Sequence, residues 1–424
     1  MIKAIRKPYK FKIPTVNDWI FGLFLFLTLF IPFTKISIPA VHRYEITFGD
    51  VILIILSFLS IMYGKGMRKS YFPFFASLLL LITMCIASAV MVRDWFGYIL
   101  SMIPFIFSIL ITYVTLTFFS SGDSRRRFNV FRKVLIFSLL LSAIPVYLQF
   151  FVGYKNIFFY DSFGWRYTFL AQNPNQYGVY FIIFFYLLTL ITVKFFPKDM
   201  GKLILFQLFF FIPAFFSGSK STTLVFAANV AILIILYVLQ ASLFKKTWII
   251  GIIAVFYISF FDSFVTMVRQ SAGQVNRALA IFDKVADIEN FEIGGGTGSS
   301  IDVAYMLAYK YPILGVGLGN KPAYTNSGIE IHNTFLLFLA ETGVLGFLAF
   351  MLMFSLPVIY ALFSRSSIQF KILIVLIFAL FAAQNVPGML FRQRWVWLFM
   401  CISFILVNVD EKGNFQKSKL TLLH

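Results

Sequence analysis

Long apolar stretches separated by short polar segments run through almost the whole chain. A helix that crosses a bilayer needs roughly 20 apolar residues, and each stretch is close to that length. We count twelve, at residues 18–37, 47–64, 71–92, 95–119, 128–152, 174–196, 202–217, 219–243, 246–265, 332–363, 368–388 and 392–409. The pattern predicts an all-α integral membrane protein with about twelve transmembrane helices.

One hydrophilic segment, at about residues 266–331, is far longer than the other connections. It divides the chain into residues 1–265 with nine predicted spans, the long loop at 266–331, and residues 332–424 with three spans and a tail. Within the loop, we expect an amphipathic helix at Ile301 to Tyr311. A loop of this length is usually functional or disordered.

Composition supports a membrane protein, because 60% of the 424 residues are hydrophobic and only 12% are charged. The 57 phenylalanines follow no period, and we expect them to face lipid. Cys85 and Cys401 both fall inside predicted spans, where a disulfide framework is improbable. No separate soluble domain is evident.

The net charge of +19 comes mainly from short loops between spans, so it favours orientation in a membrane over nucleic-acid binding. With both termini in the cytoplasm, most of the 36 lysines and arginines lie on the cytoplasmic side. No small-residue cleavage site follows the first stretch, so we expect it to be a retained span. The outer face then receives the long loop and Arg166, Lys220, His332, Arg392 and Arg394.

Arg166 lies shortly before a predicted span and can bind phosphate through two parallel hydrogen bonds. Asn173-Pro174-Asn175 then supplies a turn and a helix start, whose free backbone N–H groups favour an anion. The alternative is an anchor at the membrane interface, together with Trp165 and Tyr167. The residues leave both interpretations open.

Two more basic sites occupy polar breaks on the same predicted face. Lys220 lies in a Ser-Gly-Ser-Lys-Ser-Thr-Thr segment between two apolar stretches, which suits a phosphate or sugar but also a simple turn with a snorkelling lysine. Arg392 and Arg394 open the last span beside tryptophans. They are either interfacial anchors or a second anion site.

His332 directly precedes a long apolar stretch, whereas His42 lies in a short loop and His424 ends the chain. A polar residue at this place often only begins a helix. However, an imidazole whose pKa is near neutral is also the natural base for removing a hydroxyl proton.

Other polar features favour no chemistry. Gly294 to Ser300 lacks the preceding strand and the Lys-Ser/Thr ending of a phosphate loop. A lone outer histidine without cysteines or a paired acidic cluster provides no zinc ligand set. Glu341 lies inside a predicted span, where a carboxylate is costly in lipid, so we expect it to face the protein interior without a catalytic role.

The segment from Pro312 to Phe350 carries a series of spaced motifs. A glycine-rich turn precedes a His-Asn-Thr sequence, and a Glu-Thr-Gly sequence follows; the residues are Pro312, Gly315, Gly317, Gly319, His332, Asn333, Thr334, Phe335, Glu341, Thr342, Gly343 and Gly346. This series resembles the O-antigen polymerase and O-antigen ligase superfamily, which comprises membrane glycosyltransferases acting on polyprenyl-diphosphate-linked sugars. A second family motif is matched by Arg166, Thr168, Asn173, Pro174 and Asn175.

The match is incomplete at two places. Ser219-Lys220-Ser221 stands where the family usually has an arginine, and lysine keeps the charge but loses the two-pronged hydrogen bonding. The arginine and tryptophan that often follow a Gly-Ser element in the family are absent after Ser300.

The resemblance implies a large-loop, all-helical fold of the GT-C-like polymerase and ligase type in the cytoplasmic (inner) membrane. It implies a polymerase that joins undecaprenyl-diphosphate-linked oligosaccharide repeats on the outer face, without nucleotide, metal or other cofactor. The implied partners are this donor, membrane lipid and a chain-length regulator protein. The implied site comprises His332 as general base, with diphosphate or substrate bound by Arg166, Lys220, Arg392, Arg394 and Asn333.

Two alternatives stay open. A ligase uses a similar donor but transfers the glycan to a lipid-core acceptor, and a second anion site at Arg392 and Arg394 favours the polymerase over it. A polysaccharide transporter or flippase also suits twelve spans. Carriers tend to place ionisable residues mid-bilayer and to show paired halves, whereas here such residues cluster at span ends.

Overall fold

The computed structural model describes residues 15–30, 37–39, 45–64, 66–120, 123–160, 167–171, 174–217, 219–240, 251, 298–325, 331, 333–383, 393–410 and 413. Six of its helices are long and apolar enough to cross a membrane, and four shorter apolar helices accompany them. The chain is therefore a helical, multi-pass membrane protein. The count of twelve spans stays a prediction, because the stretch at 246–265 lies outside the described residues except for residue 251.

Helices begin and end close to the apolar stretches of the sequence. In the first half they are α1 (Val16–Phe30), α2 (Phe48–Tyr63), α3 (Phe72–Ala87), α4 (Trp95–Ser120), α5 (Ser124–Val152), α6 (Pro174–Phe195), α7 (Met200–Phe209), α8 (Phe211–Phe216) and α9 (Lys220–Gln240). In the second half they are α12 (Gly298–Lys310), α13 (Lys321–Thr325), α14 (Thr334–Phe363), α15 (Ile368–Ala383) and α16 (Arg394–Asn408). The amphipathic helix expected at Ile301 to Tyr311 is confirmed as α12.

Two local features differ from the expectation. Strands β1 (Ser37–Pro39) and β2 (Glu45–Thr47) pair antiparallel between α1 and α2, although no strand was expected. The apolar stretch at 202–217 forms two helices, α7 and α8. Pro213 has no N–H to donate to the carbonyl of Phe209 four residues earlier, and the Tyr147 hydroxyl of α5 donates to that carbonyl instead.

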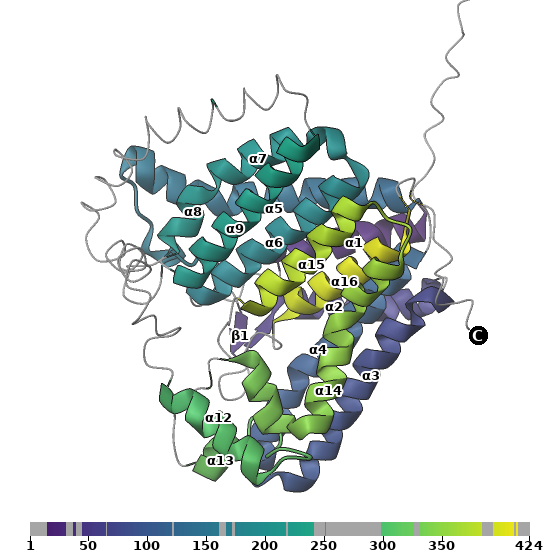
Figure 1. Cartoon of the computed structure of the whole chain (residues 1–424), viewed down its shortest axis with the longest axis vertical. Coiled ribbons are helices and arrows are strands. Elements are labelled where there is room, and N and C mark those ends of the chain that lie inside the picture. The colour runs from purple at the N-terminus through teal and green to yellow at the C-terminus, as the bar shows by residue number, and fades with distance from the viewer. Residues whose placement is uncertain are drawn as a thin grey trace, which may run out of the picture.

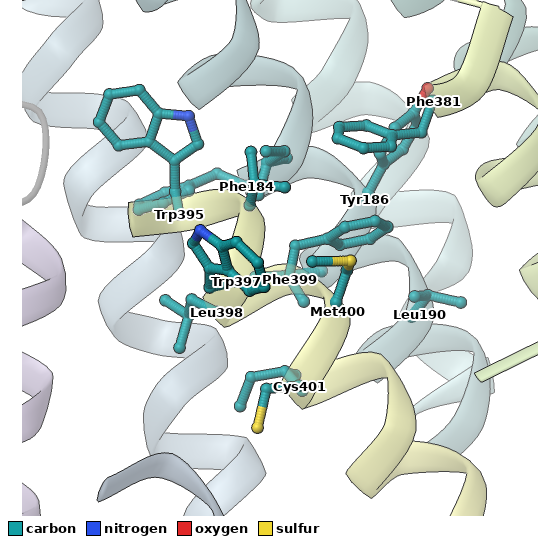
Figure 2. Close-up of a cluster of buried hydrophobic side chains, with 14 of the residues drawn as sticks. Phe184, Tyr186, Leu190, Phe381, Trp395, Trp397, Leu398, Phe399, Met400 and Cys401 are labelled. Carbon is teal, nitrogen blue, oxygen red and sulfur yellow. The ribbon is translucent and has the colours of Figure 1, made fainter. Parts of the chain in front are cut away.

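Helices α6 and α16 form the centre of the bundle. Every residue of α16 from Trp395 to Asn408 is buried, and so is the whole apolar window of α6. Figure 2 shows side chains of α6, α15 and α16 packed into one aromatic cluster, in which the Phe399 ring lies 5.9 Å from Tyr186 and 5.3 Å from Phe381. The expectation that phenylalanines face lipid is therefore wrong for these helices, because helices that are apolar all round belong in the interior.

Polar contacts join the helix ends that the charge pattern assigns to the cytoplasm. Arg132 at the start of α5 binds Asp199 between α6 and α7 at 2.8 Å, and this hydrogen bond lowers the pKa of the Asp199 carboxyl. Lys194 at the end of α6 donates to the Leu406 carbonyl of α16 at 2.5 Å and to Ser366, between α14 and α15, at 3.1 Å.

A second set of contacts joins segments assigned to the outer face. Asn320 accepts the backbone N–H groups of Arg93 and Asp94 at 2.9 and 2.7 Å, which ties the long loop to the α3–α4 connection. The Tyr167 N–H donates to the Phe216 carbonyl at 3.0 Å. Figure 1 shows α12 and α13 together beside one end of α14. The two groups of helix ends therefore lie at opposite ends of the bundle, as the alternation of spans requires.

Labelling of single cysteines tests this arrangement. Tyr309 on α12 is 88% exposed, and Lys198 is exposed at the other end of the bundle. In intact cells, we expect a membrane-impermeant maleimide to label Tyr309→Cys and not Lys198→Cys, with both labelled after lysis. The parent protein is the control, because Cys85 and Cys401 are buried. Labelling of both sites from outside would contradict the fold.

Candidate functional site

The predicted site residues differ in how much of them the structure describes. Arg166, His332 and Arg392 lie outside the described residues, and Lys220 is described only as the first residue of α9. Asn333 and Arg394 are described with their side chains. The site is therefore built from the segments that flank these positions.

The segments next to Arg166 and Lys220 lie side by side. Tyr167, which follows Arg166, donates its backbone N–H to Phe216, four residues before Lys220. The helices that come next also approach closely, because a methyl group on Gly178 of α6 would lie 2.0 Å from the hydroxyl oxygen of Thr222 on α9. The starts of α6 and α9 are thus adjacent.

Aromatic contacts connect these helices to the starts of α16 and α14. The Tyr180 ring of α6 lies 6.0 Å from Trp395, the second residue of α16. Phe105 of α4 lies 5.9 Å from Trp397 of α16 and 6.0 Å from Phe338 of α14. The four helices that follow the predicted site residues therefore begin at the same end of the bundle.

Asn333 caps the first turn of α14. Its side-chain oxygen accepts the backbone N–H of Leu336 at 3.1 Å, an arrangement that satisfies one of the free donors of a helix start. Asn333 thereby stabilises the first turn of α14. Its predicted role in binding substrate stays a prediction.

Helix α14 is broken at Gly343, where φ is +66°. In an unbroken helix, Val344 and Leu345 would donate to the carbonyls of Ala340 and Glu341. Instead, their N–H groups bond to Pro312 and Ile313 of the glycine-rich turn, at 2.8 and 3.5 Å, while the freed carbonyls accept the N–H groups of residues 316 and 317 at 3.1 and 2.8 Å. The turn and the broken helix exchange hydrogen-bond partners.

This exchange requires glycine on both sides. A methyl group on Gly315 would lie 2.4 Å from the backbone of Glu341, and one on Gly343 would lie 2.2 Å from the carbonyl oxygen of Ile313. Both residues also adopt the left-handed conformation that glycine tolerates best. The sequence motifs of the turn and of Glu341-Thr342-Gly343 are therefore two halves of one structural unit.

Glu341 faces the protein interior, as expected. It is 5% exposed, and its side-chain oxygen Oε1 accepts the N–H of Gly319 at 3.0 Å. Asn320, which follows Gly319 in the turn, is fully buried. Besides accepting the N–H groups of Arg93 and Asp94, its side-chain amide donates to the Asp94 carbonyl at 3.0 Å. Sequence reasoning missed Asn320 as a bridge to the connection between α3 and α4. The only sequence signal for it is its place in the glycine-rich motif.

Arg394 pairs with a carboxylate of its own chain. Its guanidinium forms two hydrogen bonds with Asp50, whose side chain is completely buried and also accepts from the backbone and hydroxyl of Thr47 at the start of α2. The sequence reading missed Asp50, although Thr47 and Asp50 have the spacing of a capping box. The predicted binding of diphosphate by Arg394 is untested, but the pair accounts for the arginine at this place.

No protein-family model matches the chain, and no curated protein matches its sequence. The family resemblance therefore stays an expectation that depends on the motifs themselves. Within the described parts of the chain, no three His, Cys, Asp or Glu side chains come together as a metal site would need.

Alanine at Gly343 tests the exchange between turn and helix. We expect Gly343→Ala to lower the free energy of unfolding by at least about 2 kcal/mol, because the new methyl group clashes with Ile313 in a strained conformation. Gly22→Ala is the matched control, since no atom lies within 4 Å of its added methyl group. Thermal unfolding in detergent measures the stability of both variants. Equal stabilities would refute the exchange of hydrogen bonds between the turn and α14.

A double-mutant cycle tests the pair of Asp50 and Arg394. Removing one partner leaves a buried charge, so Asp50→Asn and Arg394→Gln should each cost about 3–5 kcal/mol of stability. The double variant should cost clearly less than the sum of the two. If Arg394→Gln instead unfolded at the parent temperature, the arginine would be free for another role.

Proposed function

We propose that this protein is a glycosyltransferase that polymerises polyprenyl-diphosphate-linked oligosaccharide repeats on the outer face of the cytoplasmic membrane. One observation supports the proposal most. The starts of α6, α9, α14 and α16, which follow the predicted basic and imidazole residues in the sequence, meet at one end of the bundle.

Such an end suits a lipid diphosphate for two physical reasons. Helix starts carry partial positive charge and free N–H donors, which favour a bound anion. The phosphates of a membrane lipid lie at the depth where spanning helices end, so Arg166 and Lys220 would reach them without entering the hydrocarbon.

In the proposed reaction, His332 accepts the proton of an acceptor hydroxyl as its oxygen bonds to the anomeric carbon of the donor sugar. The bond between that carbon and the diphosphate oxygen breaks, and polyprenyl diphosphate leaves. Arg166 and Lys220 stabilise the negative charge that develops on it. Asn333, the next residue in the chain, caps the start of α14.

A ligase would use the same donor chemistry with a different acceptor. The sequence argument for a polymerase rested on a second anion site at Arg392 and Arg394. The bond between Arg394 and Asp50 weakens that argument, which now depends on Arg392. For a transporter, ionisable groups would be expected mid-bilayer. Glu341 is an ionisable group within a span, but the described polar cluster of Gln207, Thr189 and Asn229 is uncharged.

The test is made with purified protein in liposomes, supplied with the polyprenyl-diphosphate-linked repeat unit of its source. We expect a ladder of polymers on a gel, and His332→Ala should slow its formation roughly a hundred- to ten-thousandfold, because the general base is lost. His42→Ala is the matched control and should keep full activity. The stability of each variant is measured alongside.

Other outcomes distinguish the rivals. Transfer that occurs only after a lipid-core acceptor is added would make the protein a ligase. Absence of any transfer, together with movement of the lipid-linked sugar across the bilayer, would make it a transporter. Full polymerisation by His332→Ala would rule out the histidine as the base.

A further inference from the structure

The break at Gly343 divides α14 into two parts with different surroundings. The first part, Thr334 to Thr342, begins at the cap next to His332. Its residue Ala340 packs with α12 and Val316 in a smaller hydrophobic cluster, whereas Phe338 belongs to the main core and stacks on Phe350 of the second part at 4.8 Å. The second part packs with α15 and α16 in the main core.

An unbroken run of helical hydrogen bonds therefore does not fix the position of the first part of α14 relative to the second. Across the break, the helical bonds of Val344 and Leu345 are replaced by bonds to the glycine-rich turn. The main-chain bonds therefore make the angle between the parts depend on the turn, and the ring contacts of Phe335 and Phe338 with Phe350 join the same two parts in the core. Asn320 holds this turn to the connection between α3 and α4.

One described side chain connects the first part directly to the anchored end of the turn. The carboxylate of Glu341 accepts the N–H of Gly319, the neighbour of Asn320. Gly319 is confined from the other side, because a methyl group there would lie 2.1 Å from the hydroxyl oxygen of Ser101 on α4. Contacts therefore run without interruption from Glu341 to α4.

We propose that Glu341 is a positioning residue, which fixes the first part of α14 through Gly319 and thereby sets the helix start that follows the proposed base in the sequence. The role in catalysis rests on the proposed function. The role in positioning does not, because it concerns only the angle between the two parts of the helix.

The proposal assigns the positioning to the hydrogen bond from Gly319 and not to the charge of the carboxylate. Glu341→Gln keeps a side-chain oxygen that can accept the Gly319 N–H, whereas Glu341→Ala removes the acceptor of this partly buried donor. The two variants therefore separate positioning from a requirement for a carboxylate.

The first experiment measures positioning without any substrate. Spin labels are attached at Leu339→Cys and Leu352→Cys, one in each part of α14, with Cys85 and Cys401 replaced by alanine. Neither leucine belongs to a core cluster, and a straight helix would separate them by about 20 Å. We expect a narrow distribution of the distance between the labels in the protein with Glu341 and in the Glu341→Gln variant. In Glu341→Ala, the distribution should be broadened or shifted.

The second experiment measures turnover in the liposome assay. Glu341→Ala should lower kcat by roughly ten- to a hundredfold, because the base is misplaced, with the KM for the donor unchanged. Glu341→Gln should restore most of the activity. A variant that only unfolds would instead lose active protein in proportion to its lost stability, so kcat is expressed per folded molecule.

Each outcome decides one point. An unchanged distance distribution in Glu341→Ala overturns the positioning role. If Glu341→Gln has a narrow distance distribution but is as inactive as Glu341→Ala, the positioning role is also overturned. That result would show that the carboxylate itself takes part in the reaction. A parent protein without transferase activity refutes the proposed function, while the distance measurement still tests the role of Glu341.

Discussion

Two backbone hydrogen bonds are missing from the middle of α14, and their donors and acceptors make four hydrogen bonds with the glycine-rich turn instead. In a membrane, an unpaired peptide group costs several kcal/mol, so a helix break is tolerated only where other groups take up the freed donors and acceptors. The turn does so only because Gly315 and Gly343 let the two backbones approach more closely than any side chain allows. The entry to α14, the docking of α12 and the contact with α4 all depend on this exchange.

The remainder of the bundle follows a simpler rule. Its interior is filled by aromatic and aliphatic side chains around α6 and α16, and most of the charged groups stay at the helix ends. The ion pair of Arg132 with Asp199 joins helix ends on one side of the bundle, and the pair of Arg394 with Asp50 joins helix ends on the other. A rigid interior with polar ends keeps the starts of α6, α9, α14 and α16 together.

The candidate site was predictable to different degrees. Polar breaks and helix-start chemistry mark Lys220 and Asn333, and both begin or cap a helix as these signals indicate. The partner of Arg394 was not predictable, because Asp50 lies 344 residues away in the sequence and a capping box does not reveal a second bond. The interior position of Glu341 followed from the cost of a carboxylate in lipid, but its bond to Gly319 did not.

The sequence by itself determined that the chain is helical and membrane-embedded, where most helices begin and end, and which helix ends share a side. These properties depend on local hydrophobicity, turn residues and charge, all of which act over about one span. Only the tertiary structure decided that α6 and α16 lie at the centre, that α14 breaks at Gly343, and which carboxylate holds Arg394. These depend on close approach between segments far apart in the chain, and no local pattern records such an approach.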